Sequence, residues 1–263
     1  MDFVGILIAC LVVGGTGLVI GLLLGFAGKT FEVKVDERVA AVREALPSNN
    51  CGACGYAGCD ACAEAIVAGK ASVNACPVGG EACANTIAEI MGTTSEETQK
   101  MVAFVKCNGT CDKTKDRFEY YGSHDCYEAA MSTGGGAKQC SYGCLGLGSC
   151  VKACQFDALS IVNGIAKVDP EKCTSCGQCI KACPKGLIEL VPYGKKYHIA
   201  CNSHDMGKDV IASCENGCIG CTMCVRNCPV QAVTMDNFVA VIDYDKCVEC
   251  GKCDEVCKRD III

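Results

Sequence analysis

A set of eight cysteines recurs in this chain at a constant interval of 74 residues. The first copy consists of Cys140, Cys144, Cys150, Cys154, Cys173, Cys176, Cys179 and Cys183, and the second of Cys214, Cys218, Cys224, Cys228, Cys247, Cys250, Cys253 and Cys257. The second copy has a ninth cysteine, Cys221, where the first copy has Leu147. Each copy carries the cysteine spacing of a module that binds two iron–sulfur clusters. We therefore expect the chain to fold around clusters and to carry electrons.

The ligand sets follow from the crossed pattern of two-cluster ferredoxins, in which three cysteines of one run bind a cluster with the fourth cysteine of the other run. This pattern predicts three complete sites: Cys173, Cys176, Cys179 and Cys154; Cys218, Cys221, Cys224 and Cys257; and Cys247, Cys250, Cys253 and Cys228. The remaining site, with Cys144, Cys150 and Cys183, lacks the ligand that Leu147 replaces.

The cysteines around this incomplete site allow two arrangements. In the preferred one, an additional cluster is held by Cys107, Cys111, Cys126 and Cys140, and the Leu147 site has three cysteines. In the other, Cys140 completes the Leu147 site. Because seven thiols cannot fully ligate two four-iron clusters, one site holds a three-iron cluster, has a non-cysteine ligand or is empty. The spacing from Cys126 to Cys140 matches that from Cys201 to Cys214 within one residue, so Cys126 and Cys140 belong to the duplicated unit. Cys201 and Cys214 are left over as a pair without an assigned site.

A separate motif precedes the repeats, with Cys51, Cys54 and Cys59 followed by Cys76. Glycines between these cysteines let the backbone curl and direct N–H groups at sulfur, which tunes the potential of a cluster. We interpret the motif as a 4Fe–4S site, with a four-cysteine zinc site as the alternative. Cys62 and Cys83 lie on helices expected over residues 60–68 and 82–91, where we expect buried thiols rather than ligands.

The composition favours small metal-bound units over one large core. The chain has 263 residues with 28 cysteines and no Trp, and small units with little apolar core need disulfides or metals to hold them together. Runs of the type C-x2-C-x2-C-x3-C gather four sulfurs around one point, whereas disulfides usually close longer loops. The net charge of −6, without any tract rich in Lys or Arg, argues against nucleic acid as a partner.

The first residues predict a membrane anchor. Residues 3–27 are apolar or Gly/Thr throughout, which is long enough for a transmembrane helix, and no cleavable signal peptide is recognised. Basic residues follow at Lys29, Lys34, Arg38 and Arg43. The positive-inside rule then predicts a single-pass protein of the inner cell membrane with its cluster domains on the cytoplasmic side.

The expected fold class is α+β. The chain is divided into a transmembrane helix (1–28), a small helical 4Fe–4S domain (29–105), a cysteine-rich insert (106–139) and two tandem dicluster modules resembling bacterial ferredoxin (140–195 and 196–263). Helical spacing and a capping box predict two further helices over residues 35–46 and 94–105. Short β-type stretches predict strands over residues 159–162, 165–168, 233–235 and 239–242.

Several motifs occur in a characteristic order: the anchor, Cys51-Gly-Ala-Cys54-Gly-Tyr-Ala-Gly-Cys59 with Cys76-Pro, the cysteine-rich insert, Tyr142-Gly-Cys144-Leu-Gly-Leu-Gly-Ser-Cys150 and Cys218-Ile-Gly-Cys221. In this order they resemble the B subunit of the Rnf complex, a membrane ferredoxin:NAD+ oxidoreductase, in its clostridial type. The resemblance covers essentially the whole chain. It implies a protein that receives electrons from soluble ferredoxin and passes them to membrane subunits, while flavins and the NAD site belong to other subunits. The complex moves Na+ or H+.

The ligand sets amount to about six clusters, mostly 4Fe–4S, with a three-iron cluster as one outcome at the Leu147 site. We expect no catalytic residue, because no dinucleotide or phosphate-binding glycine motif is recognised and the three histidines, His124, His198 and His204, belong to no metal motif. The alternatives are a polyferredoxin subunit of another membrane dehydrogenase or hydrogenase, an iron–sulfur redox sensor and a zinc scaffold.

Overall fold

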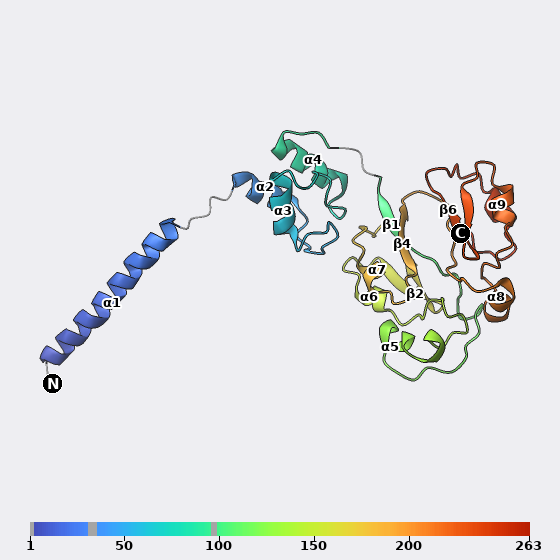
Figure 1. Cartoon of the computed structure of the whole chain (residues 1–263), viewed down its shortest axis with the longest axis horizontal. Helices are drawn as coiled ribbons and strands as arrows, with labels where there is room; N and C mark the ends of the chain where they lie inside the picture. Colours follow the sequence, from blue (N-terminus) through green and yellow to red (C-terminus); the bar gives the residue numbers. More distant parts are fainter. Residues whose placement is uncertain (1–2, 31–35, 96–98) are drawn as a thin grey trace.

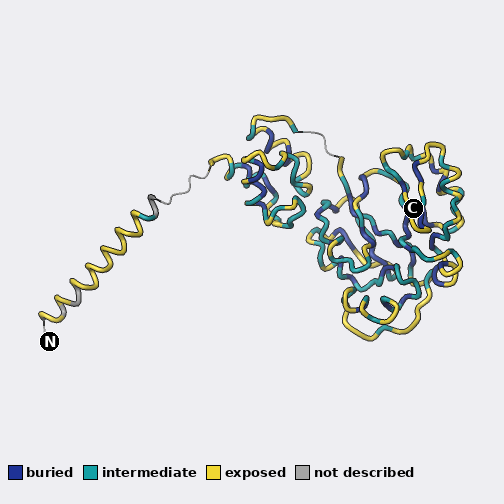
Figure 2. The backbone as a smooth tube through the Cα atoms, in the orientation of Figure 1, coloured by how far each residue is buried: buried dark blue, intermediate teal, exposed yellow. Residues whose placement is uncertain are grey.

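The computed structural model describes residues 3–30, 36–95 and 99–263. It begins with helix α1 (Phe3–Thr30), which lies apart from the rest of the chain in Figure 1. The large apolar side chains described along α1 are exposed, as the yellow tube in Figure 2 shows.

The structure contradicts the predicted transmembrane helix. Among the described residues, no helix is both long enough and apolar enough to cross a bilayer. The predicted location, a single-pass protein of the inner membrane with cytoplasmic clusters, depended on that helix and is corrected with it. Lys34, one of the basic residues used in that prediction, lies outside the described residues.

Three helices form a small unit after α1: α2 (Glu37–Ala45), α3 (Cys59–Val67) and α4 (Gly80–Met91). Asp36 caps α2 by accepting a hydrogen bond from the N–H of Arg38. The core of the unit includes Val42, Ile66 and Ile87, which are fully buried. The helices predicted near residues 35–46, 60–68 and 82–91 are confirmed, apart from Val35, which lies outside the described residues.

The helix predicted over residues 94–105 is wrong, because Met101–Val105 forms strand β1. β1 pairs in antiparallel fashion with β4 (Ile188–Pro192). Val102 and Val105 are buried in the core of the first ferredoxin-like module. The β-branched and aromatic residues of this segment favour a strand, and long-range pairing with β4 outweighs the local capping signal. Residues 96 and 97 of the predicted capping box lie outside the described residues.

The first module is built on a hairpin of β2 (Leu159–Val162) and β3 (Ile165–Val168). Asn163 and Gly164 form its turn with φ values of 48° and 73°, the left-handed geometry that an Asn-Gly pair supplies in two-residue hairpins. The short helices near the hairpin are α5 (Cys126–Ala130), η1 (Thr133–Gly135), α6 (Ser149–Lys152) and α7 (Gln178–Ala182).

The second module repeats this plan with the hairpin of β5 (Val233–Asp236) and β6 (Val239–Ile242). Its helices are α8 (Gly207–Ser213), α9 (Met223–Asn227) and α10 (Lys252–Glu255). The four strands predicted in the two modules are confirmed, and hairpins with short helices give the α+β arrangement expected of the ferredoxin-like part.

The chain's last residues pair with the segment that opens the second module. Ile262 bridges to Ile199, and the N–H groups of His198 and Ile263 donate to each other's carbonyl oxygens at 2.8 and 3.1 Å. The N–H of Asn108 donates to the carbonyl of Ala200 at 3.0 Å. The segment that leads into the first module therefore runs beside the segment that leads into the second, and Figure 2 shows buried backbone inside both.

Candidate iron–sulfur centres

The helical unit brings together the cysteines of the N-terminal motif. One cavity is lined by Cys51, Cys54, Cys59 and Cys76. The side-chain oxygen of Asn50 accepts from the N–H of Cys59 at 2.8 Å and fixes the start of α3 beside the cavity. Cys62 lines the same cavity and hydrogen-bonds Cys54. The Cys83 thiol donates to the carbonyl of Ala45 at 3.2 Å. Cys62 is thus buried as expected, but it is adjacent to the site.

The structure places cysteines of the three ligand sets near one another, and their role as cluster ligands stays a prediction. The Cys179 thiol has Cys176, Cys173 and Cys154 as electrostatic neighbours. In the second module, the neighbours of Cys224 include Cys218, Cys221 and Cys257. Those of Cys253 are Cys247 and Cys250, and Cys228 packs against the same core.

The incomplete site of the first module receives its fourth cysteine from the insert. One cavity is lined by Cys126, Cys144, Cys150 and Cys183. The N–H of Cys126 donates to the Ser149 hydroxyl at 2.7 Å, and that hydroxyl donates to Asp125 at 3.1 Å. Because Ser149 directly precedes Cys150, these bonds tie the start of α5 to the run that contains Leu147. Neither arrangement predicted for the insert cysteines contains this set.

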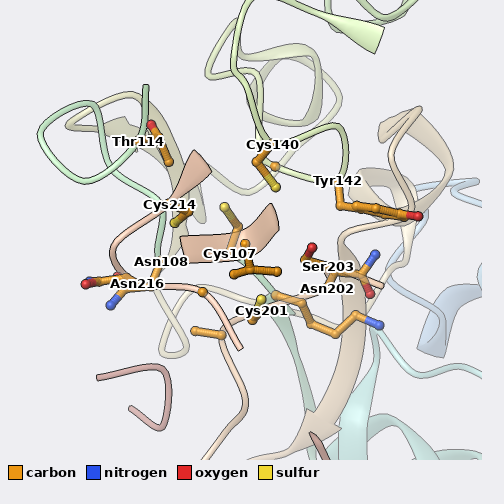
Figure 3. Close-up of a pocket in the computed structure, with 16 residues that line it drawn as sticks. Cys107, Asn108, Thr114, Cys140, Tyr142, Cys201, Asn202, Ser203, Cys214 and Asn216 are labelled. Carbon is orange, nitrogen blue, oxygen red and sulfur yellow. The ribbon is translucent and has the colours of Figure 1, made fainter. Parts of the chain in front are cut away.

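The preferred arrangement placed Cys107 and Cys140 with Cys111 and Cys126. In the structure they lie beside Cys201 and Cys214 instead. All four line one cavity, and Figure 3 shows their side chains around a common space, carried by separate chain segments. We call this set, Cys107, Cys140, Cys201 and Cys214, the junction cysteines. Cys111 is exposed, with its sulfur next to Gly164. Cys201 and Cys214 are site residues that the sequence interpretation left unassigned.

Backbone N–H groups point at several of the sulfurs. The N–H of Ala103 donates to Cys173 at 3.3 Å. The N–H of Ala158 donates to Cys154 at 3.4 Å, and its counterpart 74 residues later, Ala232, donates to Cys228 at 3.2 Å. Such bonds stabilise negative charge on sulfur and tune the potential of a cluster. The two modules therefore repeat the environment of the sulfurs as well as their spacing.

Burial raises the pKa of two thiols in these sites, Cys150 and Cys224, when no iron is bound. From an ordinary value of 9.0, burial as the largest cause raises the pKa of Cys150 to about 12 and that of Cys224 to about 11. A thiol with such a pKa is protonated at neutral pH. Iron binding must therefore displace a proton from Cys150 and from Cys224, as it does at other thiolate sites.

The cysteine groups fit a cluster better than a single metal ion. Within the described residues, no group of three or more His, Cys, Asp or Glu side chains is arranged to hold one ion. Zinc requires four sulfurs at about 2.3 Å from one point, whereas the groups here surround cavities. His198 has hydrogen-bond partners of its own, with Tyr244 at 2.8 Å and the Lys195 carbonyl at 3.0 Å, and His124 is exposed.

Family models match three parts of the chain. A model described as "Putative Fe-S cluster" matches residues 46–78, a "4Fe-4S binding domain" matches residues 166–189, and a "4Fe-4S dicluster domain" matches residues 217–262. The first of these ranges contains the whole N-terminal cysteine motif, and the other two lie within the repeated modules.

Relatives with curated names are similar along nearly the whole chain. The B subunit of the Na(+)-translocating ferredoxin:NAD(+) oxidoreductase complex of Acetobacterium woodii is 49% identical over 98% of this chain and 77% of its own length. The chain belongs to the family of Rnf complex B subunits. The B subunit of the ion-translocating oxidoreductase complex of Methanosarcina acetivorans is 44% identical over 95% of each chain. The B subunit of the proton-translocating ferredoxin:NAD(+) oxidoreductase complex of Clostridium ljungdahlii is 40% identical over 90% of this chain and 84% of its own.

The resemblance predicted from the motif order is thereby confirmed. As a B subunit of this family with 4Fe–4S domains, the chain is an iron–sulfur electron-transfer subunit of an ion-translocating oxidoreductase complex.

Proposed function

We propose that this protein receives electrons from a soluble ferredoxin and passes them to other subunits of a complex that reduces NAD+ and moves Na+ or protons. The names of the relatives from A. woodii and C. ljungdahlii support this, because both are subunits of ferredoxin:NAD(+) oxidoreductases. The observation that carries the proposal is the grouping of the cysteines into four-sulfur sites around cavities, since clusters held in this way exchange single electrons.

We propose five 4Fe–4S sites on this basis. Their ligand sets are Cys51, Cys54, Cys59 and Cys76; Cys126, Cys144, Cys150 and Cys183; Cys154, Cys173, Cys176 and Cys179; Cys218, Cys221, Cys224 and Cys257; and Cys228, Cys247, Cys250 and Cys253. With Cys126 as the fourth ligand, the Leu147 site no longer requires a three-iron cluster or a non-cysteine ligand.

When bound, each cluster takes up and releases one electron. The chain's own groups decide where the clusters lie and how easily they are reduced. N–H donors such as those of Ala158 and Ala232 stabilise the additional negative charge of a reduced cluster. Buried apolar side chains such as Ile165 and Val239 pack beside the cysteines and keep water from the sulfurs.

The test is rapid mixing of the anaerobically purified chain with reduced ferredoxin. The visible absorption of the clusters should bleach on mixing, and the rate should fall as salt is raised, because transient docking of charged partners is steered electrostatically. A chain that contains iron but accepts electrons only from another carrier would instead be a polyferredoxin of a different dehydrogenase. A chain purified without iron and sulfide would overturn the proposal.

A further inference from the structure

The junction cysteines lie outside the residues that the family models match, which are 46–78, 166–189 and 217–262. Cys107 and Cys140 belong to the insert and the start of the first module, and Cys201 and Cys214 to the start of the second. Their common cavity is also lined by Asn108, Ala200 and Asn202, the neighbours of Cys107 and Cys201 in the chain. The cavity thus lies at the contact between the two modules.

The four cysteines form two equivalent pairs. The N–H of Cys144 donates to the Cys107 sulfur at 3.4 Å, and the N–H of Cys218 donates to the Cys201 sulfur at 3.2 Å. Cys144 and Cys218 are counterparts in the 74-residue repeat, as are Cys140 and Cys214. The spatial counterpart of Cys201 is therefore Cys107, and one pair comes from each module.

The backbone leading into each pair confirms this equivalence. The N–H of Lys106 donates to the carbonyl of Leu187 at 2.7 Å, and the N–H of Ala200 donates to the carbonyl of Ile261 at 2.7 Å. Leu187 and Ile261 are again 74 residues apart, whereas Cys107 and Cys201 are 94 apart. About twenty extra residues in the insert of the first copy therefore hide the relation between Cys107 and Cys201 in the sequence.

The junction cavity offers hydrogen bonds to negatively charged sulfur. The N–H groups of Tyr142 and Gly143 donate to Cys140, that of Ser203 to Cys201 and that of Asn216 to Cys214. A ring of N–H groups of this kind favours an anionic group inside it.

Two basic side chains brace the walls of the cavity. The buried Lys138 ammonium donates to the carbonyls of Gly109 and Gly164 at 2.9 and 3.0 Å, and the Arg259 guanidinium donates to the carbonyl of Cys214 at 2.5 Å. A Cβ added at Gly109 would lie 2.7 Å from the Thr114 methyl group and 3.4 Å from the Cys214 sulfur, so the backbone lies close to the sulfurs. The site is therefore built from both modules and closely packed.

We propose that Cys107, Cys140, Cys201 and Cys214 together hold a 4Fe–4S cluster that connects the two modules. A four-iron cubane has two-fold symmetry axes. It can therefore be bound by two equivalent pairs of cysteines, one pair from each module. The N–H groups of Cys144 and Cys218 donate directly to sulfurs of this proposed cluster, one from each module. Both cysteines belong to other proposed clusters, so the junction cluster gives electrons a path from one module to the next. The inference rests on the proposed function in that the chain carries iron–sulfur clusters.

The test counts iron, sulfide and zinc in the anaerobically purified full chain and in single and double variants. Cys107→Ala and Cys201→Ala should each remove about four iron and four sulfide atoms. The Cys107→Ala/Cys201→Ala double variant should lose no more than either single variant, because both residues bind the same cluster. Cys111→Ala is the matched negative control, since Cys111 is an exposed cysteine of the same insert. Cys176→Ala is the positive control and should remove a different cluster, so that its loss adds to that of Cys201→Ala.

Unchanged iron in Cys201→Ala, with iron lost from Cys176→Ala, would overturn the junction cluster alone. Unchanged iron in both variants would instead overturn the proposed function. One zinc per chain that disappears in Cys201→Ala, or additive iron loss in the double variant, would also overturn the junction cluster. If an alanine variant fails to fold, Cys201→Ser keeps the side-chain volume. It should alter the EPR spectrum of one cluster and leave the other spectra unchanged, and an unaltered spectrum would count against the proposal.

Discussion

Single residues decide which sulfurs complete each site. Leu147 marks a missing ligand that sequence comparison finds at once, because every other position of the run keeps its cysteine. The replacement, Cys126, lies more than twenty residues upstream and reaches the cavity through its bond to Ser149. No spacing rule predicts that bond. Sequence reasoning could recognise the gap and the surplus cysteines, but the pairing between them required the fold.

The Cys126→Ala variant tests this assignment. The Leu147 site would then have three thiols, so we expect one cluster to be lost or converted to a three-iron form, with a loss of about one to four iron atoms per chain. EPR of the oxidised protein, together with iron counting, distinguishes the two results. Cys111→Ala should change neither measurement. Equal iron contents in the two variants would mean that Cys126 is not a ligand.

His198 is predicted to make stability depend on pH. Burial lowers its pKa from 6.5, so the neutral ring is favoured in the folded chain. Stability should be complete above pH 6.5 and should fall below it by up to about 1.4 kcal/mol per pH unit, because the unfolded state binds the additional proton. Denaturant unfolding of the anaerobic protein between about pH 7.5 and 5.5 measures this slope. His198→Gln should flatten it, whereas the same change at the exposed His124 should leave it intact; similar slopes in the two variants would exclude the role of His198.

At the scale of elements, local patterns predicted the hairpins well and one strand badly. Asn163-Gly164 and the β-type residues beside it specify a hairpin within a few positions, and that prediction is confirmed. β1 depends on its pairing with β4, which is far away in the sequence, while the capping box before it favoured a helix. The N–H of Ala103 in β1 also donates to Cys173, so this strand contributes to a cluster site that its sequence position did not indicate.

The same Val→Thr substitution at two strand positions measures how much β1 contributes to the free energy of unfolding. Val102 in β1 is buried, whereas Val162 in β2 is 51% exposed. Val102→Thr should lower the free energy of unfolding by about 1–3 kcal/mol, because a hydroxyl is buried in an apolar core. Val162→Thr should change it by less than about 0.5 kcal/mol. Urea unfolding of both variants under anaerobic conditions gives the comparison, and equal effects would show that β1 does not support the module core.

At the scale of the whole molecule, the helical unit is connected to the first module by a bond between two cluster sites. The side-chain amide of Gln178, next to Cys179, donates to the carbonyl of Cys51. The sequence predicted both sites separately but not this contact, because no repeat relates them. The anchor was predicted from hydropathy alone, and among the described residues the structure offers no helix that meets the length and apolarity required.

Gln178→Ala should loosen this connection without removing iron. Loss of one hydrogen bond costs about 1 kcal/mol, which corresponds to a roughly fivefold lower ratio of docked to undocked molecules. EPR of the reduced protein should show weaker magnetic interaction between the N-terminal cluster and those of the first module. Gln155→Ala is the matched control, since Gln155 is also a glutamine beside a cluster cysteine and is exposed. An unchanged interaction in Gln178→Ala would show that the contact does not hold the two units together.

The paired origin of the junction cysteines has a consequence for how such a chain can arise by gene duplication. One module supplies two of the four thiols, so an ancestor with a single module has only half of this site. Two identical copies that face each other would complete the proposed junction site, so an ancestor that paired with itself would have had this site before any fusion of its genes. Fusion into one polypeptide then lets each half change separately, and the extra segment with Cys126 is found in one half only.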